Sequence, residues 1–218
     1  MPLRRRSFST LALLFAALLG SVAPVHAQTP NAQALVDRLE AKYDGSQALR
    51  AQFTQTTSQS GGQTRTLDGT LTLAGDRYRV ETGRQTLVTD GETTWVYTPS
   101  RDQVLVNDYV KSETAFSPGQ FFDGYQERYR ATGVRTARRS GTAHRVLTLE
   151  PRQGGAFFQQ VTLWVRASDA VVTRMVVEDA GGSQMTFSLR DVTFGAETTA
   201  STFRFEAPQG VEVVDLRS

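Results

Sequence analysis

Cysteine is absent from this 218-residue chain, and histidine occurs only as His26 and His144. Without cysteine there is no disulfide framework, and no N-terminal cysteine could carry a lipid anchor. No His/Cys cluster can hold zinc, and no acidic loop has the spacing of an EF-hand. A G-x-S-x-G elbow and a phosphate-binding glycine loop are also missing. The sequence therefore gives no reason to expect an enzyme, a metal or a cofactor.

Long apolar runs are missing too, apart from Leu11–Val22, which follows the basic cluster Arg4–Arg6. This run is short for a membrane span, and Val25-His26-Ala27 is typical of a cleavage site after a signal peptide. The pattern predicts a signal peptide over residues 1–27, cleaved near Ala27, and an exported, soluble mature protein. An uncleaved anchor is the alternative. Residues 28–218 contain no linker or repeat and are expected to form a single domain.

The small excess of basic residues belongs to that leader. The chain has 24 basic and 22 acidic residues, and removing the three arginines of the leader leaves 21 basic residues against 22 acidic ones. A nearly neutral mature chain gives no reason to expect a nucleic-acid partner. Arg138-Arg139 is a small basic patch, which we interpret as a solvated loop, and His144 is expected on the surface.

Most of the chain alternates between apolar and polar residues, as strands do. Asp90-Gly91 predicts a type I′ hairpin turn, and Pro99–Asp102 predicts a second turn after a strand that contains Trp95 and Tyr97. Ten or eleven strands are expected in all, the last near Phe203–Phe205. The sequence thus predicts a mainly β protein, either a barrel or a strongly curved sheet.

One helix is expected near the start, with Thr29 as its N-cap, Pro30 at its first position and an end at Asp44-Gly45. Its apolar stripe needs a partner surface, and only the sheet is large enough. A second segment, residues 111–127, is aromatic and lacks alternation, so we expect a short helix or loop over the sheet. Together they form a predicted lid, with Leu35, Leu39, Tyr43, Phe121 and Phe122 facing the sheet.

The same strands supply a candidate apolar lining. Its predicted members are large apolar side chains that we place on one face of the sheet: Leu71, Leu73, Tyr78, Val80, Trp95, Tyr97, Met175, Val177, Met185 and Phe187. Methionine adapts well to irregular ligands. The alternative interpretation is that these residues form an ordinary closed core.

Three motifs in a fixed order resemble one family. Phe53-Thr54-Gln55 follows the helix, Asp90-Gly91 begins a D-G-x-x-x-W-x-Y-x-P stretch, and Phe203–Val211 reads F-x-F-x-x-P-x-G-V. Over Leu35–Asp215 the chain resembles the periplasmic outer-membrane lipoprotein carriers, the LolA family. The resemblance implies an unclosed half-barrel with helices as a lid, whose apolar interior takes the acyl chains of lipoproteins.

The resemblance also implies partners. These are triacylated lipoproteins, an inner-membrane ABC transporter that releases them, and an outer-membrane acceptor or that membrane itself. We expect a periplasmic monomer. In the family an arginine after a basic-proline pair holds the lid shut; here Ala74-Gly75-Asp76 replaces the pair, and Arg77 and Arg79 are the candidate latch. Two alternatives stay open: a periplasmic protein for another lipid or hydrophobic ligand, and a hydrolase.

Overall fold

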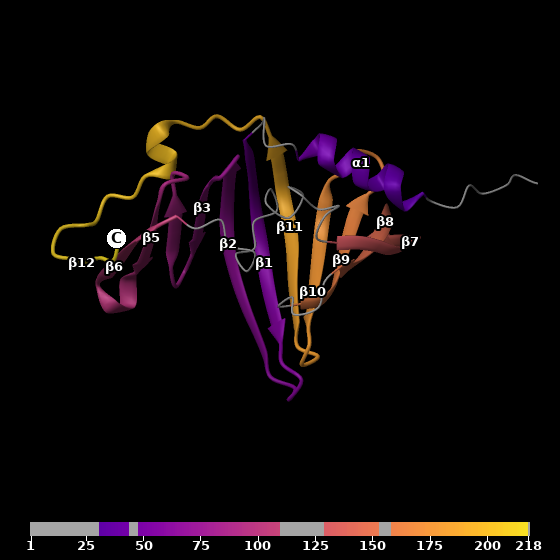
Figure 1. Cartoon of the computed structure of the whole chain (residues 1–218), viewed down its shortest axis with the longest axis horizontal. Coiled ribbons are helices and arrows are strands. Elements are labelled where there is room, and N and C mark those ends of the chain that lie inside the picture. Colours follow the sequence, from indigo (N-terminus) through magenta and orange to yellow (C-terminus); the bar gives the residue numbers. More distant parts are fainter. Residues whose placement is uncertain (1–30, 44–47, 110–128, 153–157, 218) are drawn as a thin grey trace, which may run out of the picture.

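The computed structural model describes residues 31–43, 48–109, 129–152 and 158–217. Within them the chain forms one α-helix, α1 (Ala32–Lys42), two short 3₁₀ helices and one sheet of twelve strands (Figure 1). The strands are β1 (Leu49–Ser58), β2 (Thr64–Ala74), β3 (Arg77–Thr82), β4 (Thr86–Thr89), β5 (Thr93–Thr98), β6 (Gln103–Asp108), β7 (Tyr129–Arg139), β8 (Thr142–Pro151), β9 (Phe158–Arg166), β10 (Val172–Asp179), β11 (Gln184–Phe194) and β12 (Glu212–Asp215).

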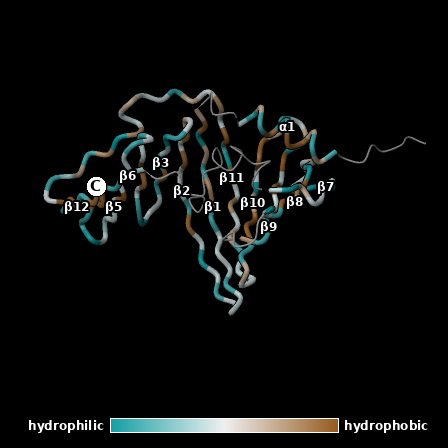
Figure 2. The backbone as a smooth tube through the Cα atoms, in the orientation of Figure 1, coloured by the Kyte–Doolittle hydropathy of each residue, from teal (hydrophilic) through white to brown (hydrophobic). Residues whose placement is uncertain are grey.

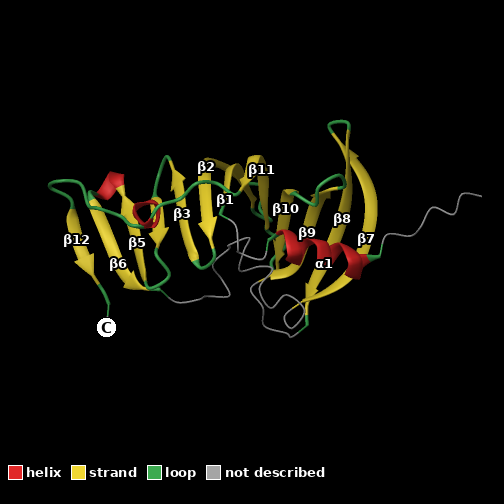
Figure 3. Cartoon of the chain, turned by 90° about the horizontal axis from the view of Figure 1, so that it is seen from above, coloured by secondary structure: helices red, strands yellow, loops and turns green. Residues whose placement is uncertain are grey.

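The sheet is open. Its order is β12-β6-β5-β4-β3-β2-β1-β11-β10-β9-β8-β7, and every neighbouring pair is antiparallel except β12 and β6. The end strands β7 and β12 lie far apart in two perpendicular views (Figures 1 and 3). The sheet also twists, so that β7 runs nearly across the direction of β1 in Figure 1. A mainly β fold with an unclosed sheet and an N-terminal helix is confirmed, with twelve strands instead of ten or eleven.

The strand register divides the side chains between two faces. Partners opposite each other share a face, so one continuous row of apolar residues crosses five strands: Val134, Leu147, Leu163, Met175 and Phe187. Helix α1 lies on this face, which we call the helix face (Figure 3). The chain after β11 crosses the other side of the sheet, which we call the arm face.

The N-cap of helix α1 lies two residues later than predicted. Asn31, not Thr29, is its N-cap, and the Asn31 side chain accepts a hydrogen bond from the backbone N–H of Gln33 at 2.9 Å. The helix ends at Lys42, with Tyr43 as its C-cap, whereas the predicted end at Asp44-Gly45 lies outside the described residues. The predicted stripe is confirmed, because Leu35, Val36 and Leu39 are buried against the sheet.

The hairpin at Asp90-Gly91 forms, but not with the predicted turn. Three residues, Asp90–Glu92, connect β4 to β5, and of these only Gly91 has a positive φ, at 94°. The Asp90 carboxylate accepts hydrogen bonds from the backbone N–H groups of Glu92 and Thr93 at 3.0 and 2.8 Å. The aspartate side chain therefore organises the loop, and the left-handed conformation that a type I′ turn requires at Asp90 is unnecessary.

The predicted strand near Phe203–Phe205 is wrong. Residues 195–211, which we call the arm, contain the 3₁₀ helix η2 (Ala200–Phe203), and they lead to β12, which pairs in parallel with β6. Phe203 is buried, and so are Val88, Val104 and Val106 on the arm face of β4 and β6. The arm thus covers a second, smaller core on the side of the sheet away from α1.

His144 is buried, not exposed as expected. Its side chain retains only 3% of its accessible surface, and its ring nitrogens lie 3.0 Å from the Thr142 carbonyl oxygen and 2.9 Å from the Thr173 hydroxyl. The ring also meets Trp164 edge-on, with centroids 6.0 Å apart. Both nitrogens are satisfied by neutral groups, which is the environment of a structural histidine.

Candidate functional site

The helix face carries most of the buried apolar residues of the described chain. Eight of the ten predicted lining residues share it, by the pairing that runs from β3 through β1 to β10: Leu71, Leu73, Tyr78, Val80, Met175, Val177, Met185 and Phe187. Figure 2 shows the hydrophobic positions in β8, β9 and β10 and in the helix α1 that lies on them. The candidate site is therefore this face together with α1.

Trp95 and Tyr97 do not belong to it. Trp95 pairs with Val88, and Val88 pairs with Arg79, which places all three on the arm face. The ring of Tyr97 packs on Phe205 of the arm, with centroids 5.3 Å apart. The prediction that all ten residues share one face is wrong for these two. The sequence predicts a strand at Phe203–Phe205, and it predicts no segment that would cover aromatic residues on that side.

Sequence reasoning missed residues at both ends of the helix face. The apolar residues of β8 and β9 under α1 are almost fully buried: Leu147, Leu149, Val161 and Leu163. Leu87 on β4 and Leu189 on β11 belong to the same face and are only half-buried, as are the predicted Val80, Val177 and Phe187. The alternation in these strands contained part of the signal, since Leu147 and Leu149 stand two residues apart with Thr148 between them and Glu150 after them.

The C-terminal end of α1 is fixed to the sheet by specific contacts. The Tyr43 hydroxyl accepts a hydrogen bond from the backbone N–H of Val172 at 2.9 Å. The Tyr43 ring meets Phe194 edge-on at 5.3 Å, and the Lys42 ammonium lies 4.1 Å from the centre of the same ring. Burial raises the pKa of Tyr43 to about 12, so the hydroxyl stays protonated.

Of the predicted lid, the structure places Leu35, Leu39 and Tyr43 on the helix face, all buried. Phe121 and Phe122 lie outside the described residues. Helix α1 lies over the β7–β11 side of the sheet, whereas Val80 and Leu87 belong to β3 and β4 on the other side of β1. The helix face therefore extends well beyond the part that α1 covers.

The predicted latch faces the wrong way. Tyr78 and Val80 point to the helix face, so Arg77 and Arg79, which alternate with them, point to the arm face. Arg79 donates hydrogen bonds to the carbonyl oxygens of Thr202 and Arg204 at 3.5 and 3.3 Å, and it pairs with Glu81 at 2.8 Å. The Arg77 guanidinium lies 5.0 Å from the Phe203 ring centre. Both arginines hold the arm, not α1.

The chemistry that this face offers is apolar. In the described ranges no three acidic, histidine or cysteine side chains come together in a way that could hold a metal ion. No helix of the same ranges has the length and hydropathy that a membrane span needs. What the arrangement provides is a broad hydrocarbon surface, partly covered by a helix whose C-terminal end is held by the Tyr43–Val172 hydrogen bond and by ring contacts.

The sequence motifs and the open sheet agree with a comparison to known families. The model of the family described as "Outer membrane lipoprotein carrier protein LolA" matches residues 44–206, well over half of the chain. The chain belongs to the LolA family.

Individual LolA-family relatives match over nearly the full length. An outer-membrane lipoprotein carrier protein of Alkalilimnicola ehrlichii is 29% identical over 93% of this chain and 95% of the relative. A protein of the same name from Hahella chejuensis is 28% identical over 89% of this chain and 95% of the relative. A crystal structure of a conserved protein from Thermus thermophilus superposes with a TM-score of 0.55 at 19% identity, covering 84% of this chain and 98% of that one. This last likeness concerns the fold alone.

Proposed function

We propose that this chain is a periplasmic carrier that binds the acyl chains of lipoproteins on the helix face and delivers them to the outer membrane. Membership of the LolA family supports lipoproteins as the cargo. The site is supported by half-buried apolar residues of the helix face on strands between β4 and β10 of the sheet order: Val80, Leu87, Val177, Met185, Phe187 and Leu189. This set of half-buried apolar side chains on one face of the sheet is the observation that carries the proposal.

Physical chemistry explains why such a face suits a carrier. Each methylene of an acyl chain costs about 0.8 kcal/mol to expose, so an unaccompanied lipoprotein would not cross an aqueous compartment. A broad surface without fitted polar groups accepts chains of different length and releases them to a more apolar acceptor. Helix α1 would shield the chains, and its movement for loading would break the Tyr43–Val172 hydrogen bond at its end.

The proposal includes the path of the cargo. A signal peptide over residues 1–27 would direct export, and residues 28–218 would act as a single monomeric unit. An ABC transporter of the inner membrane would load the carrier, and an outer-membrane acceptor or the membrane itself would unload it. The helix face would bind the same acyl chains from loading to unloading.

The test uses two neighbouring valines of β10. Val177 lies on the helix face and Val176 on the arm face, and both are half-buried. Val177→Glu places a carboxylate against bound hydrocarbon, which costs several kcal/mol, whereas Val176→Glu adds the same charge on the other side. Purified proteins are added to spheroplasts, and released triacylated lipoprotein is measured in the supernatant.

We expect wild-type protein and the Val176→Glu variant to release lipoprotein, and the Val177→Glu variant to release at least about tenfold less. Circular dichroism establishes that both variants are folded. Equal release by the two folded variants would remove the helix face from the proposal. Mass spectrometry of lipid that accompanies the purified protein provides a second arm, since a different bound lipid without lipoprotein release would favour another hydrophobic ligand.

A further inference from the structure

The hairpin formed by β7 and β8 concentrates positive charge at one end of the sheet. Residues 130–150 contain five arginines and one acidic residue, Glu150, which is paired with Arg130 at 3.0 Å. Four arginines remain around the turn at Ser140-Gly141: Arg135, Arg138, Arg139 and Arg145. None of these four forms a salt bridge within the described residues, so their charge is uncompensated locally.

Three of these four arginines contact neutral groups. Arg138 donates to the Gly141 carbonyl oxygen at 3.0 Å, and Arg145 donates to the Thr136 hydroxyl at 3.0 Å. The Arg135 guanidinium lies 5.5 Å from the centre of the Trp164 ring. Arg135 and Arg138 are exposed, and the other two are half-buried. The guanidinium groups of Arg135, Arg138 and Arg145 are therefore held in place while most of their donors stay available to an anion.

Nearby acidic residues do not cancel this charge. Asp169 is bound twice by Arg166, with both oxygens at 2.8 Å. Helix α1, which contacts β7, carries two acidic residues, Asp37 and Glu40, balanced by Arg38 and Lys42. The hairpin projects past the neighbouring strands in Figure 3, so the charge lies at a protruding end of the molecule.

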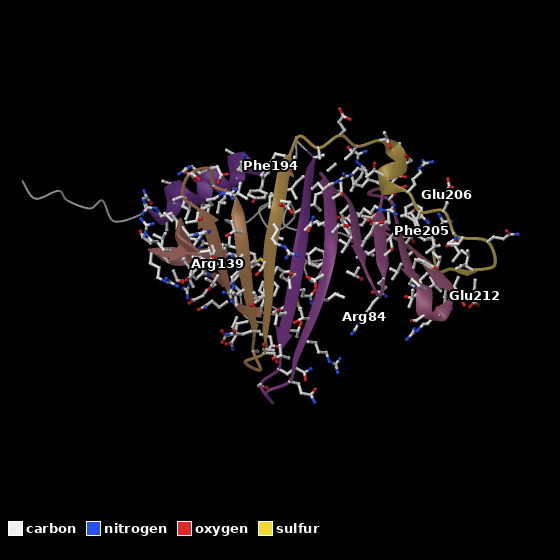
Figure 4. All side chains as sticks on the ribbon, turned by 180° about the vertical axis from the view of Figure 1, so that it is seen from behind. Arg84, Arg139, Phe194, Phe205, Glu206 and Glu212 are labelled. Atoms are coloured by element: carbon white, nitrogen blue, oxygen red, sulfur yellow. The ribbon has the colours of Figure 1, made fainter. Side chains whose placement is uncertain are left out.

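The opposite end of the sheet is acidic. Residues 90–109 and 204–217, around β5, β6 and β12, contain seven acidic and three basic residues together. Figure 4 shows Arg139 at one end of the molecule and Glu206 and Glu212 at the other. Such a separation of charge orients a diffusing protein, here with the hairpin towards a negative surface and the acidic end away from it.

We propose that the β7–β8 hairpin docks the protein on anionic phospholipid headgroups at a membrane surface. A protein partner is less well matched, because protein interfaces depend on a few buried apolar or aromatic anchors. In the described residues the large exposed apolar side chains are Val213 and Leu216, at the other end of the sheet. Around the turn, Thr136–Ala143 offers arginine and small side chains only. The arginines are spread around the turn and have no large apolar side chain among them. Such a surface suits an extended layer of phosphates.

Docking by charge alone is weak and reversible. Each basic residue near an anionic bilayer raises binding about fivefold, and the attraction fades within a Debye length. Four arginines would hold the protein briefly at a membrane and let it leave again. The four arginines lie around the hairpin turn, Arg135 and Arg139 on the arm face and Arg138 and Arg145 on the helix face. Val177, which tests acyl-chain binding, lies on β10, so docking and acyl-chain binding are tested with different residues.

The test is sedimentation of the purified protein with vesicles of equal parts phosphatidylglycerol and phosphatidylcholine, and with vesicles of phosphatidylcholine alone. One triple variant replaces Arg135, Arg138 and Arg139 with glutamine. The matched control replaces Arg65, Arg84 and Arg101, which are exposed and have no salt bridge within the described residues, with the same amide. Both triples change the net charge by the same amount, and circular dichroism establishes that both are folded.

We expect wild-type binding to the anionic vesicles only, lost as salt rises from about 0.1 M to about 1 M. The hairpin triple should bind about a hundredfold more weakly, and the control triple within about threefold of wild type. The Val177→Glu variant should still sediment with the vesicles. Absent wild-type binding, or equal losses in the two triples, would overturn the proposal. Binding to polyglutamate but not to vesicles would overturn it in favour of an acidic protein partner.

Discussion

The hydroxyl of Tyr43, at the end of α1, accepts the backbone hydrogen bond of Val172, at the start of β10, over a distance of 2.9 Å. Both residues are buried, with 7% and 5% of their surface exposed. The bond replaces a strand partner for the Val172 N–H, because the β9–β10 register shifts between Val172 and Arg174. One side chain thus completes the sheet and fixes the helix at the same time.

Replacing Tyr43 with phenylalanine should lower the free energy of unfolding by about 1–3 kcal/mol, because a buried N–H loses its acceptor. Urea denaturation measures the change. Tyr97→Phe is the control, since its hydroxyl has no hydrogen bond within the described ranges, and it should stay within about 0.5 kcal/mol of wild type. Equal losses in the two variants would show that the Tyr43–Val172 bond contributes nothing particular.

The ionisation of Tyr43 should lower the free energy of unfolding at alkaline pH. Burial raises the pKa of Tyr43 from 10.0 to about 12, so the folded state favours the protonated form. That contribution is fully present below pH 10 and is lost as the pH rises from about 10 to about 12, by at most about 3 kcal/mol. Unfolding free energies measured across this range should fall with pH.

Tyr43→Phe should make this decrease shallower without abolishing it. Burial also raises the pKa of Tyr78, so that residue contributes in the same direction. An unchanged slope in the Tyr43→Phe variant would mean that Tyr43 ionises as easily in the folded chain as in the unfolded one.

The sequence predicted the features that depend on local pattern. The stripe of Leu35 and Leu39 identified the helix, and alternation identified most strands, because each signal lies within a few residues. Membership of the LolA family supported the open sheet. Eight of the ten lining residues were placed on one face because they alternate consistently in β2, β3, β10 and β11.

What the sequence could not supply depends on contacts between distant segments. The parallel pairing of Val213 with Val104 joins residues more than a hundred positions apart, and no local sequence pattern predicts it. Phe205 of the arm packs on Tyr97, and the predicted strand at Phe203–Phe205 would not have provided this contact. The polar neighbours of His144 predict a surface position, whereas its half-buried partner Thr173 comes from β10.

Gly69 should not tolerate a side chain. A Cβ at this position would lie 2.5 Å from the Glu81 carbonyl oxygen and 2.6 Å from the Phe53 ring. Phe53 pairs directly with Gly69 across β1 and β2 and is itself 6% exposed, so neither neighbour has room to withdraw. Gly69→Ala should lower the free energy of unfolding by about 1–3 kcal/mol through overpacking.

Gly133→Ala is the control for Gly69. It also lies within a strand, but a Cβ there meets no atom within 4 Å and the backbone has no positive φ. This change should be neutral or stabilise by up to about 1 kcal/mol, because alanine restricts the unfolded chain. Thermal and urea unfolding of both variants decide the matter, and a neutral Gly69→Ala would mean that Phe53 moves freely.

The arm should depend on Phe203 for its position. Phe203 is 1% exposed, whereas Phe205, two residues on, is half-buried and packs on Tyr97. Truncating a fully buried phenylalanine costs about 3–5 kcal/mol, so Phe203→Ala should destabilise the protein clearly more than Phe205→Ala. Because β12 follows the arm and pairs only with β6 within the described sheet, its amides should lose protection first.

Hydrogen exchange of the Val213 and Val214 amides, with urea unfolding of both variants, measures this order. Since the arm face lies opposite the helix face, a folded Phe203→Ala variant should still release lipoprotein from spheroplasts. Loss of release together with intact β6–β12 protection would contradict the separation of the two faces. Equal destabilisation by the two alanine variants would mean that η2 is not the main anchor of the arm, and that Arg79, which binds the Thr202 and Arg204 carbonyl oxygens, holds it instead.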